Sequence, residues 1–526
     1  MLNMNQTINN KRILDKTRNA KLGIVSGIVN KIITLLLPFV VRTIFISVIG
    51  IEYAGLNSLF TSLLQVLNLA ELGFSSAVVY SMYKPIAERD DETICALLLF
   101  YKRIYIIVGI VVLFAGVIAM PFLPYLINGN SPENINLYAI YIIFLINTSI
   151  SYLLYGYKTS LLNAHQRTDV LNNINSITQL LLNVISIVIL LFYPNYYLYV
   201  IVIPLFTIVN NIMVSFKVDK MYPQYKCHGN ISKKLRNDIS KRIYGLAIQR
   251  LCIMTRNSMS SIILSAFTCL SIVGIYNNYY MIMTSLTGVI NIILTAIMAG
   301  VGNDIQIKTT EDNFKSMRKF NFLYMWIGSF SAICLTLSFQ PFMRLWLGNS
   351  YLLPTSTVLL LGLYYYNLKL GDISSTYYSA AGLWWYGKWR AILEAVLNLI
   401  VSLAFVKLWG VNGIIISTLI VHFFINILYG TSILFKYYFG YKNMWRYYYI
   451  QMYYLLTTVV TFLFVYFIVI NFERIFPTYN DVFVVLERLI VCLLITNPIL
   501  FLFYFKTNDY KWAKDWILNV IKKNNG

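Results

Sequence analysis

The sequence predicts an all-α polytopic membrane protein with about 14 transmembrane helices. Hydrophobic residues make up 58% of the 526 residues and charged residues only 12%, and the mean hydropathy is +0.65. Apolar runs long enough to cross a bilayer, about 20 residues each, recur along the whole length. A soluble protein could not bury that much apolar surface, so the membrane class follows from composition alone.

The expected spans follow one another with short connections on one side of the membrane. They cover residues 24–48, 55–83, 104–126, 137–157, 174–193, 198–216, 244–268, 277–301, 320–341, 354–380, 391–409, 413–435, 448–470 and 482–505. The basic N-terminal stretch leads into a span that is too long for a signal-peptide core, so we expect the first helix to stay in the mature protein.

The basic residues fall almost entirely in alternate connections and in both tails. The opposite side of the membrane carries only Arg344, Lys407 and Arg474. Because positive charge marks the cytoplasmic side, we expect both termini in the cytoplasm. A basic face beside anionic lipid accounts for the net charge of +21, so we expect membrane lipids and no nucleic acid as partners.

Motifs for nucleotide, metal or redox chemistry are missing from the sequence. It contains no GxxxxGK[ST] phosphate loop, and its six cysteines follow no CxxC spacing. We therefore expect no catalytic residue, no cofactor and no metal site. Transport would draw on an ion gradient (H⁺ or Na⁺), the membrane potential or the substrate gradient. The outer loops carry few acidic residues, which weighs against a membrane glycosyltransferase or polymerase.

Ionisable residues inside the spans are the candidates for function, because a charge at the centre of a bilayer costs several kcal/mol. Five cations lie well inside spans, and two anions accompany them; the cations are Lys31, Arg42, Arg250, Arg256 and Lys369, and the anions are Glu71 and Asp372. Charged residues at span ends (Glu394, Glu487 and Arg488) can reach the interface, and we assign them no role.

Helix geometry groups some of these charges. Lys31 and Arg42 are separated by 11 residues, which returns to within about 20° of the same helix face. Lys369 and Asp372 stand at i and i+3, so they can form a structural ion pair or belong to a site. Glu71 is placed to meet Lys31 from the next helix, with the same two interpretations open. Glu71 and Asp372 are thus candidates for ion coupling or for structural pairing.

A weak internal repeat divides the chain. A shift of 219 residues aligns Gly55 with Gly274 and Lys31 with Arg250, as expected for two parallel repeats of six helices with the substrate between them. The predicted parts are an N-terminal lobe at 1–217, a basic cytoplasmic linker at 218–243, a C-terminal lobe at 244–435, two added helices at 436–505 and a cytoplasmic interfacial tail at 506–526.

Two stretches resemble a known family. The segment from Arg42 to Phe60 (RTIFISVIGIEYAGLNSLF), followed by Leu69–Gly73 and Ala77, resembles the first helix pair of bacterial oligosaccharide (Wzx-type) flippases. Ala380–Leu383, Asn398, Ser402 and Gly413–Thr418 resemble their helices ten to twelve. These flippases form the polysaccharide-transport branch of the multidrug/oligosaccharidyl-lipid/polysaccharide exporter superfamily.

The resemblance implies two pseudo-symmetric lobes around a central cavity and an alternating-access cycle in the bacterial plasma (inner) membrane. The implied cargo is a polyprenyl-pyrophosphate-linked oligosaccharide repeat unit for capsule, exopolysaccharide or O-antigen, with a polysaccharide polymerase and glycosyltransferases as partners. It also implies that cavity cations bind the pyrophosphate. Arg42 matches the family stretch, whereas Lys31, Arg250, Arg256 and Lys369 are assigned by position and charge.

Three alternatives stay open. A lipid II flippase would share the fold and the basic cavity, and only the glycan that it moves would differ. A cation-extruding drug exporter of the same superfamily would need an acidic excess inside the membrane, whereas the excess here is basic. A membrane glycosyltransferase or polymerase is the alternative from a different functional class.

Overall fold

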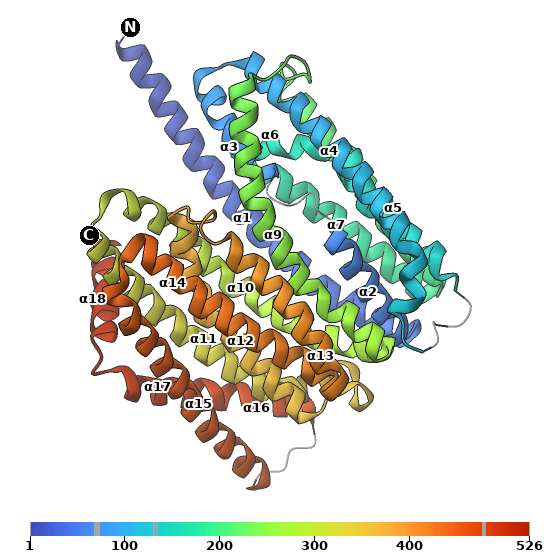
Figure 1. Ribbon diagram of the computed structural model, residues 1–526, viewed down its shortest axis with the longest axis vertical. Helices are drawn as coiled ribbons and strands as arrows, with labels where there is room; N and C mark the ends of the chain where they lie inside the picture. The colour runs from blue at the N-terminus through green and yellow to red at the C-terminus, as the bar shows by residue number, and fades with distance from the viewer. Residues whose placement is uncertain (1, 68–73, 130–131, 133–134, 476–479, 525–526) are drawn as a thin grey trace. The chain divides into compact units, whose positions relative to one another are not determined.

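The computed structural model describes residues 2–67, 74–129, 132, 135–475 and 480–524. These residues form helices and connecting loops, without a β-strand among them (Figure 1). The predicted all-α class is therefore confirmed. The chain divides into two compact units, Met1–Gly274 and Ile275–Gly526, and the boundary falls within α10, Leu270–Ile307. The division into lobes of six helices with a linker and added helices stays a prediction.

Unit 1 is a bundle of long helices that pack side by side. Its helices are α1 (Leu2–Val48), α2 (Ile51–Leu67), α3 (Phe74–Glu88), α4 (Asp91–Ala119), α5 (Leu137–Leu153), α6 (Thr159–Ala164), α7 (Thr168–Phe192), α8 (Tyr196–Met221), α9 (Lys233–Phe267) and the start of α10. α1 packs along α7, α7 along α8, and α8 along α5. A buried apolar cluster around Met82, Leu97 and Tyr101 fills one end of the bundle.

Unit 2 contains the remainder of α10 and the following helices. These are α11 (Thr310–Leu347), α12 (Thr355–Ala380), α13 (Lys388–Val421), α14 (Gly430–Leu434), α15 (Met444–Ile475), α16 (Asp481–Val491), α17 (Asn497–Tyr504) and α18 (Asn508–Asn524), with π-helical turns at His422–Tyr429, Phe435–Phe439 and Cys492–Thr496. α11 runs through the centre of this unit, in contact with α12, α15, α16 and α18.

In the part of the chain that the structure describes, the predicted spans lie on helical segments with shifted boundaries. The span 55–83 covers α2 and α3, and its residues 68–73 lie outside the described residues. By length and hydropathy, the described residues contain nine helical stretches that could cross a membrane, or up to ten with the bent pair Leu137–Leu153 and Gly156–Ala164. The stretch Lys388–Phe439 is 52 residues long and covers two predicted spans. They separate at Gly410, whose φ of 55° and ψ of −126° break the helix, a backbone conformation that glycine tolerates best.

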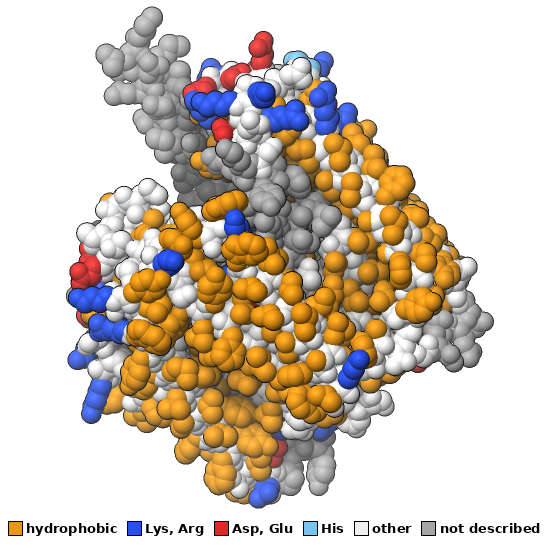
Figure 2. Space-filling view, viewed as in Figure 1, with side chains coloured by type: hydrophobic (Ala, Val, Ile, Leu, Met, Phe, Trp, Pro, Cys, Tyr) orange, Lys and Arg blue, Asp and Glu red, His pale blue; other side chains and the backbone are white. Residues whose placement is uncertain are grey.

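Apolar side chains cover the outside of the helices, as a lipid-facing surface requires. Figure 2 shows this cover over α4 and α5 in unit 1 and over α12 and α13 in unit 2. In α15, Leu456, Leu463 and Phe467 are 57–67% exposed on one side. A water-soluble protein would not expose such long apolar faces, so the chain is a multi-pass membrane protein.

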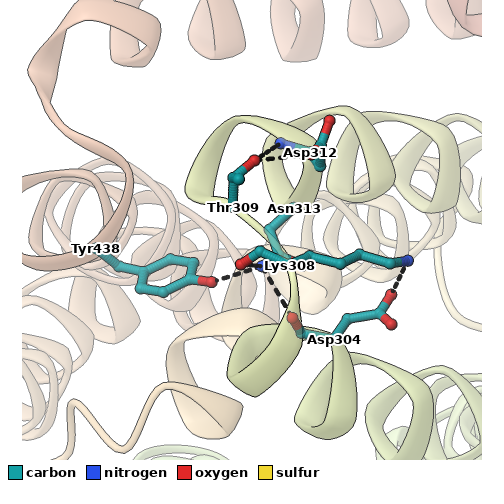
Figure 3. A network of polar contacts seen from close by, with 6 residues as sticks. All are labelled: Asp304, Lys308, Thr309, Asp312, Asn313 and Tyr438. Atoms are coloured by element: carbon teal, nitrogen blue, oxygen red, sulfur yellow. Dashed lines mark hydrogen bonds and ion pairs between the residues drawn. The ribbon is translucent and has the colours of Figure 1, made fainter.

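The connection between α10 and α11 is fixed by a polar network (Figure 3). Buried Asn313 donates from Nδ2 to the backbone carbonyls of Asp304 and Lys308 and, at 2.9 Å, to the hydroxyl of Tyr438. The Thr309 hydroxyl accepts from the backbone N–H of Asp312 at 3.2 Å and thereby caps α11. This network holds the start of α11 against the π-helical segment that carries Tyr438.

Candidate functional site

Lys31 lies on an exposed side of α1, between apolar residues that are also exposed. Ile28 and Ile32 are each 53% exposed, as expected of a helix surface in contact with lipid or with a membrane cavity. Lys31 has no ion-pair partner among the described residues. Its expected partner Glu71 lies outside the described residues, so that pairing stays a prediction.

Arg42 lies near the end of α1, where its guanidinium faces backbone carbonyls. Nη1 is 3.5 Å from the carbonyl oxygen of Ala54 in α2, and Nη2 is 3.5 Å from that of Gly274 in α10. Both distances are at the outer limit for a hydrogen bond. The side chain is half-buried, and through these contacts Arg42 bridges α1, α2 and the start of α10.

The two arginines of α9 point in different directions. Arg250 is exposed and Arg256 is half-buried, with Nε 3.4 Å from Oδ1 of Asn257. Six residues at 100° each place the two side chains about 120° apart around the helix. The neighbouring Ser258 is buried and donates to Gln65 of α2 at 3.1 Å, which fixes the face of α9 that packs in unit 1.

Lys369 and Asp372 form the ion pair that their spacing predicts, with Nζ 3.0 Å from Oδ2. The hydroxyl of Tyr324 in α11 donates to the same carboxylate oxygen at 2.5 Å. Lys369 is 1% exposed, whereas Asp372 is 27% exposed. The ammonium also lies 5.4 Å from the ring centre of Tyr365, a favourable cation–π distance. The structure therefore shows the ion pair, in which Asp372 neutralises the Lys369 charge that we assigned to the cargo. Whether these residues also belong to a site stays a prediction.

The structure distributes the candidate residues over both units. Lys31, Arg42, Arg250 and Arg256 belong to unit 1, and Lys369 and Asp372 belong to unit 2. Their convergence on one cavity, and their binding of cargo, stay predictions. Within the described residues, no group of three or more His, Cys, Asp and Glu side chains is placed to hold a metal ion.

A second buried polar cluster contains Glu394, a residue to which we assigned no role from the sequence. Glu394 is only 4% exposed, and its carboxylate accepts from Nδ2 of Asn426 at 3.2 Å. Arg390 donates to Oδ1 of the same asparagine at 2.7 Å. The expectation that Glu394 reaches the interface was wrong, because the π-helical turn His422–Tyr429 packs over it. The i, i+4 spacing of Arg390 and Glu394 was the available signal.

The buried contact of the C-terminal helix was not predicted from the sequence. Arg318 of α11 pairs with Asp509 of α18 at 2.7 Å, and both side chains are less than a tenth exposed. The Arg318 guanidinium lies 5.0 Å from the ring centre of Trp512. Lys319 lies 5.2 Å from the ring centre of Trp516. These contacts attach α18 to α11, so both tryptophans contact protein. The interfacial position of the tail stays a prediction.

Residues 21–298, just over half of the chain, match the polysaccharide biosynthesis protein family. No curated protein matches the sequence. Among solved structures, the chain is similar to the lipid II flippase MurJ in an inward closed conformation, with a TM-score of 0.67 and 15% identity over 92% of this chain and 98% of that chain. An inward-facing multidrug resistance MATE family transporter of the MOP superfamily gives a TM-score of 0.60 and 15% identity, over 79% of this chain and 99% of that chain.

A third similar structure is the MATE transporter VcmN of Vibrio cholerae in its bent form. Its TM-score is 0.51, with 13% identity over 81% of this chain and 95% of that chain. At these identities the structural matches establish the fold alone, whereas the family match rests on the sequence. The chain therefore belongs to the polysaccharide biosynthesis protein family and has the fold of transporters of the MOP superfamily.

Proposed function

We propose that the chain is a flippase, and not an enzyme, that moves a polyprenyl-pyrophosphate-linked oligosaccharide repeat unit across the bacterial plasma membrane by alternating access. Its role would be in the synthesis of a surface polysaccharide such as capsule, exopolysaccharide or O-antigen. Both termini would be cytoplasmic, and glycosyltransferases and a polysaccharide polymerase would be its partners. The family match to polysaccharide biosynthesis proteins supports this class of cargo.

The observation that carries the proposal is the pair of exposed cations Lys31 and Arg250, each of which lies inside a span predicted from the sequence. They occupy equivalent positions of the 219-residue repeat, on α1 and α9. An exposed cation costs free energy within a bilayer unless an anion or water accompanies it. A pyrophosphate supplies the matching charge, and the fork of an arginine can bind two of its oxygens at once. Arg42 and Arg256 would add donors in the same unit.

Lys369 would take part in a different way. Because Asp372 and Tyr324 hold its ammonium, Lys369 could bind cargo only if Asp372 were protonated or moved away. A change of partner of this kind could couple transport to H⁺ or Na⁺, with Asp372 as the titrating or ion-binding group. Glu71 is the other candidate for coupling.

Deletion of the gene tests the proposed cargo. We expect a lipid-linked repeat unit to accumulate on the cytoplasmic face, because its synthesis continues while its export stops. Accumulation of lipid II in its place would support the alternative, a lipid II flippase, which is the function of the similarly folded MurJ. Turnover of a sugar nucleotide by the purified protein would instead support a glycosyltransferase or polymerase.

Charge reversal tests the cations. In the deletion strain, Lys31→Glu and Arg250→Glu variants should restore export at a rate at least about tenfold below that of the wild type, since each loses a charge-assisted contact. Arg236→Glu is the matched control, because Arg236 is an exposed arginine on the same helix α9 but outside the predicted span. Normal export by both variants, at normal levels in the membrane, would refute the role of these cations.

A further inference from the structure

Unit 1 contains a partly open cavity with a polar lining between its membrane-spanning helices. The cavity has a volume of about 380 Å³ and lies between α1, α5, α7 and α8. Amide and hydroxyl side chains dominate the lining; they include Asn30, Asn175, Gln179, Thr207, Asn210 and Asn211. None of the residues that line it carries a charge. Its volume lies in the range of small-molecule sites, about 300–1,000 Å³.

The polar residues follow the helical repeat, so they form a continuous surface. In α7, the cavity is lined at positions 175, 178, 179 and 182, which share one helix face. The opposite face of the same helix is apolar, with Leu180, Val184 and Leu191 exposed by 42–58%. The amphipathic pattern of α7 therefore turns its polar side away from lipid and toward the cavity.

Some polar side chains of the lining are hydrogen-bonded to one another or to neighbouring residues, and others can bind a ligand. Thr178 donates to Oδ1 of Asn210 at 2.9 Å, and Thr207 donates to Asn147 at 2.7 Å. The side-chain amides of Asn175 and Gln179 make no hydrogen bond within the described part of the chain. Unpaired amides inside a membrane are unfavourable unless water or a ligand satisfies them.

The lining selects one chemical class of ligand. Each amide offers both a donor and an acceptor, which is the combination that a sugar hydroxyl requires. Phe206 adds an aromatic side chain to the wall, and the apolar face of a sugar ring can pack on it. A pyrophosphate or a bare metal ion would find no charged partner in this wall, so a neutral, polyhydroxylated group fits best.

We infer that this cavity binds one or more uncharged sugar residues of the cargo, while the cations outside it bind the pyrophosphate. The inference rests on the proposed function and adds to it a separate binding site for the sugar. It also limits the cargo, because the sugars that enter the cavity should lack carboxylate and phosphate groups.

The test compares two lipids on the purified full-length protein. One is the lipid-linked oligosaccharide extracted from the deletion strain, and the other is polyprenyl pyrophosphate without sugar. We expect the wild type to bind the sugar-bearing lipid at least tenfold more tightly. The variant Asn175→Leu/Gln179→Met should lose this difference and keep its affinity for the sugar-free lipid within twofold. Asn173→Leu is the control, since Asn173 is an exposed asparagine on the same helix.

Three results would overturn the inference. The double variant could keep the full preference for the sugar-bearing lipid, or it could lose affinity for both lipids equally at an unchanged melting temperature. The wild type could also bind both lipids equally, which would refute the sugar site and leave the flippase standing. If the wild type bound neither lipid, the proposed function itself would fail. If the double variant misfolds, the affinities of the Gln179→Met single variant for the two lipids are compared in the same way.

Discussion

Gly55 and Gly274 pack against each other's helix in a reciprocal contact. A Cβ atom on Gly55 would collide with the carbonyl oxygen of Leu270, and one on Gly274 would lie 2.6 Å from that of Ile51. The 219-residue shift that relates Gly55 to Gly274 also relates Ile51 to Leu270. It relates Glu52 to Ser271 as well, and the Ser271 hydroxyl donates to Oε1 of Glu52 at 3.3 Å. The repeat that aligned the two glycines thus corresponds to a symmetric crossing of α2 and α10.

Substitution at this crossing should destabilise the fold. We expect Gly55→Ala to lower the free energy of unfolding by about 1–3 kcal/mol, because the added methyl group must displace backbone and no flexible side chain can yield. Thermal unfolding in detergent measures the effect. Gly300→Ala is the control, since a Cβ atom at Gly300 meets open space. Equal melting temperatures for the two variants would mean that the helices separate without cost.

The buried ion pair of unit 2 gives the second prediction. Asp372→Asn removes the anion that pairs with fully buried Lys369, so we expect a loss of about 3–5 kcal/mol in unfolding free energy. Asp304→Asn is the control, because the Lys308–Asp304 pair has a similar length, 2.8 Å, but its lysine is 44% exposed (Figure 3), and pairs with an exposed partner contribute about 0–1 kcal/mol. A small effect at Asp372 would indicate that Lys369 is neutral or finds another partner.

The sequence predicted the features that depend on local spacing. Membrane helices follow from runs of apolar residues, the Lys369–Asp372 pair from i, i+3 geometry, and the register of the repeat from identity at Gly55 and Gly274. Features that depend on packing could not be predicted. Tyr324 is 48 residues from Asp372, and the partner of Glu394 comes from a π-helical turn that no periodicity of the sequence signals.

The polar cavity could be predicted from the sequence only in part. The stripe of α7 at 175, 178, 179 and 182 is visible in the sequence once the helical repeat is applied. The stripe was not among our candidate residues, because those were ionisable and amides and hydroxyls carry no charge. The stripe faces polar residues of α8 because of the way α7 and α8 pack. That packing cannot be predicted from a single sequence.

His165 predicts a dependence of stability on pH. Its ring stacks on Tyr222 at 4.4 Å and lies 5.7 Å from Tyr225, and burial lowers its pKa from the usual 6.5. The unfolded chain therefore binds a proton more readily, so stability is lost as the pH falls below about 6.5 toward the lower folded pKa. We expect the melting temperature of the wild type to fall more than that of His165→Phe between pH 7 and pH 5.

The control for this prediction is His228→Gln, because His228 is exposed and should not change the pH profile. The phenylalanine variant keeps an aromatic ring in the stack and removes the titrating group. If the wild type and His165→Phe lost stability in parallel, other groups would be responsible for the acid sensitivity.

The attachment of the C-terminal helix gives the last prediction. The Arg318–Asp509 pair is a buried contact between α11 and α18, and Tyr454 also donates to the Asp509 carboxylate at 3.1 Å. Asp509→Asn leaves the Arg318 charge buried and unpaired, a situation that costs about 3–5 kcal/mol. That cost exceeds what the aromatic contacts of Trp516 with Lys319 and Phe320 can offset.

We therefore expect α18 of the Asp509→Asn variant to detach from α11 and become sensitive to limited proteolysis, while the transmembrane helices stay resistant. Asp515→Asn, an exposed position on the same helix, should be cleaved no faster than the wild type; equal resistance of both variants would show that the aromatic contacts alone hold α18 in place.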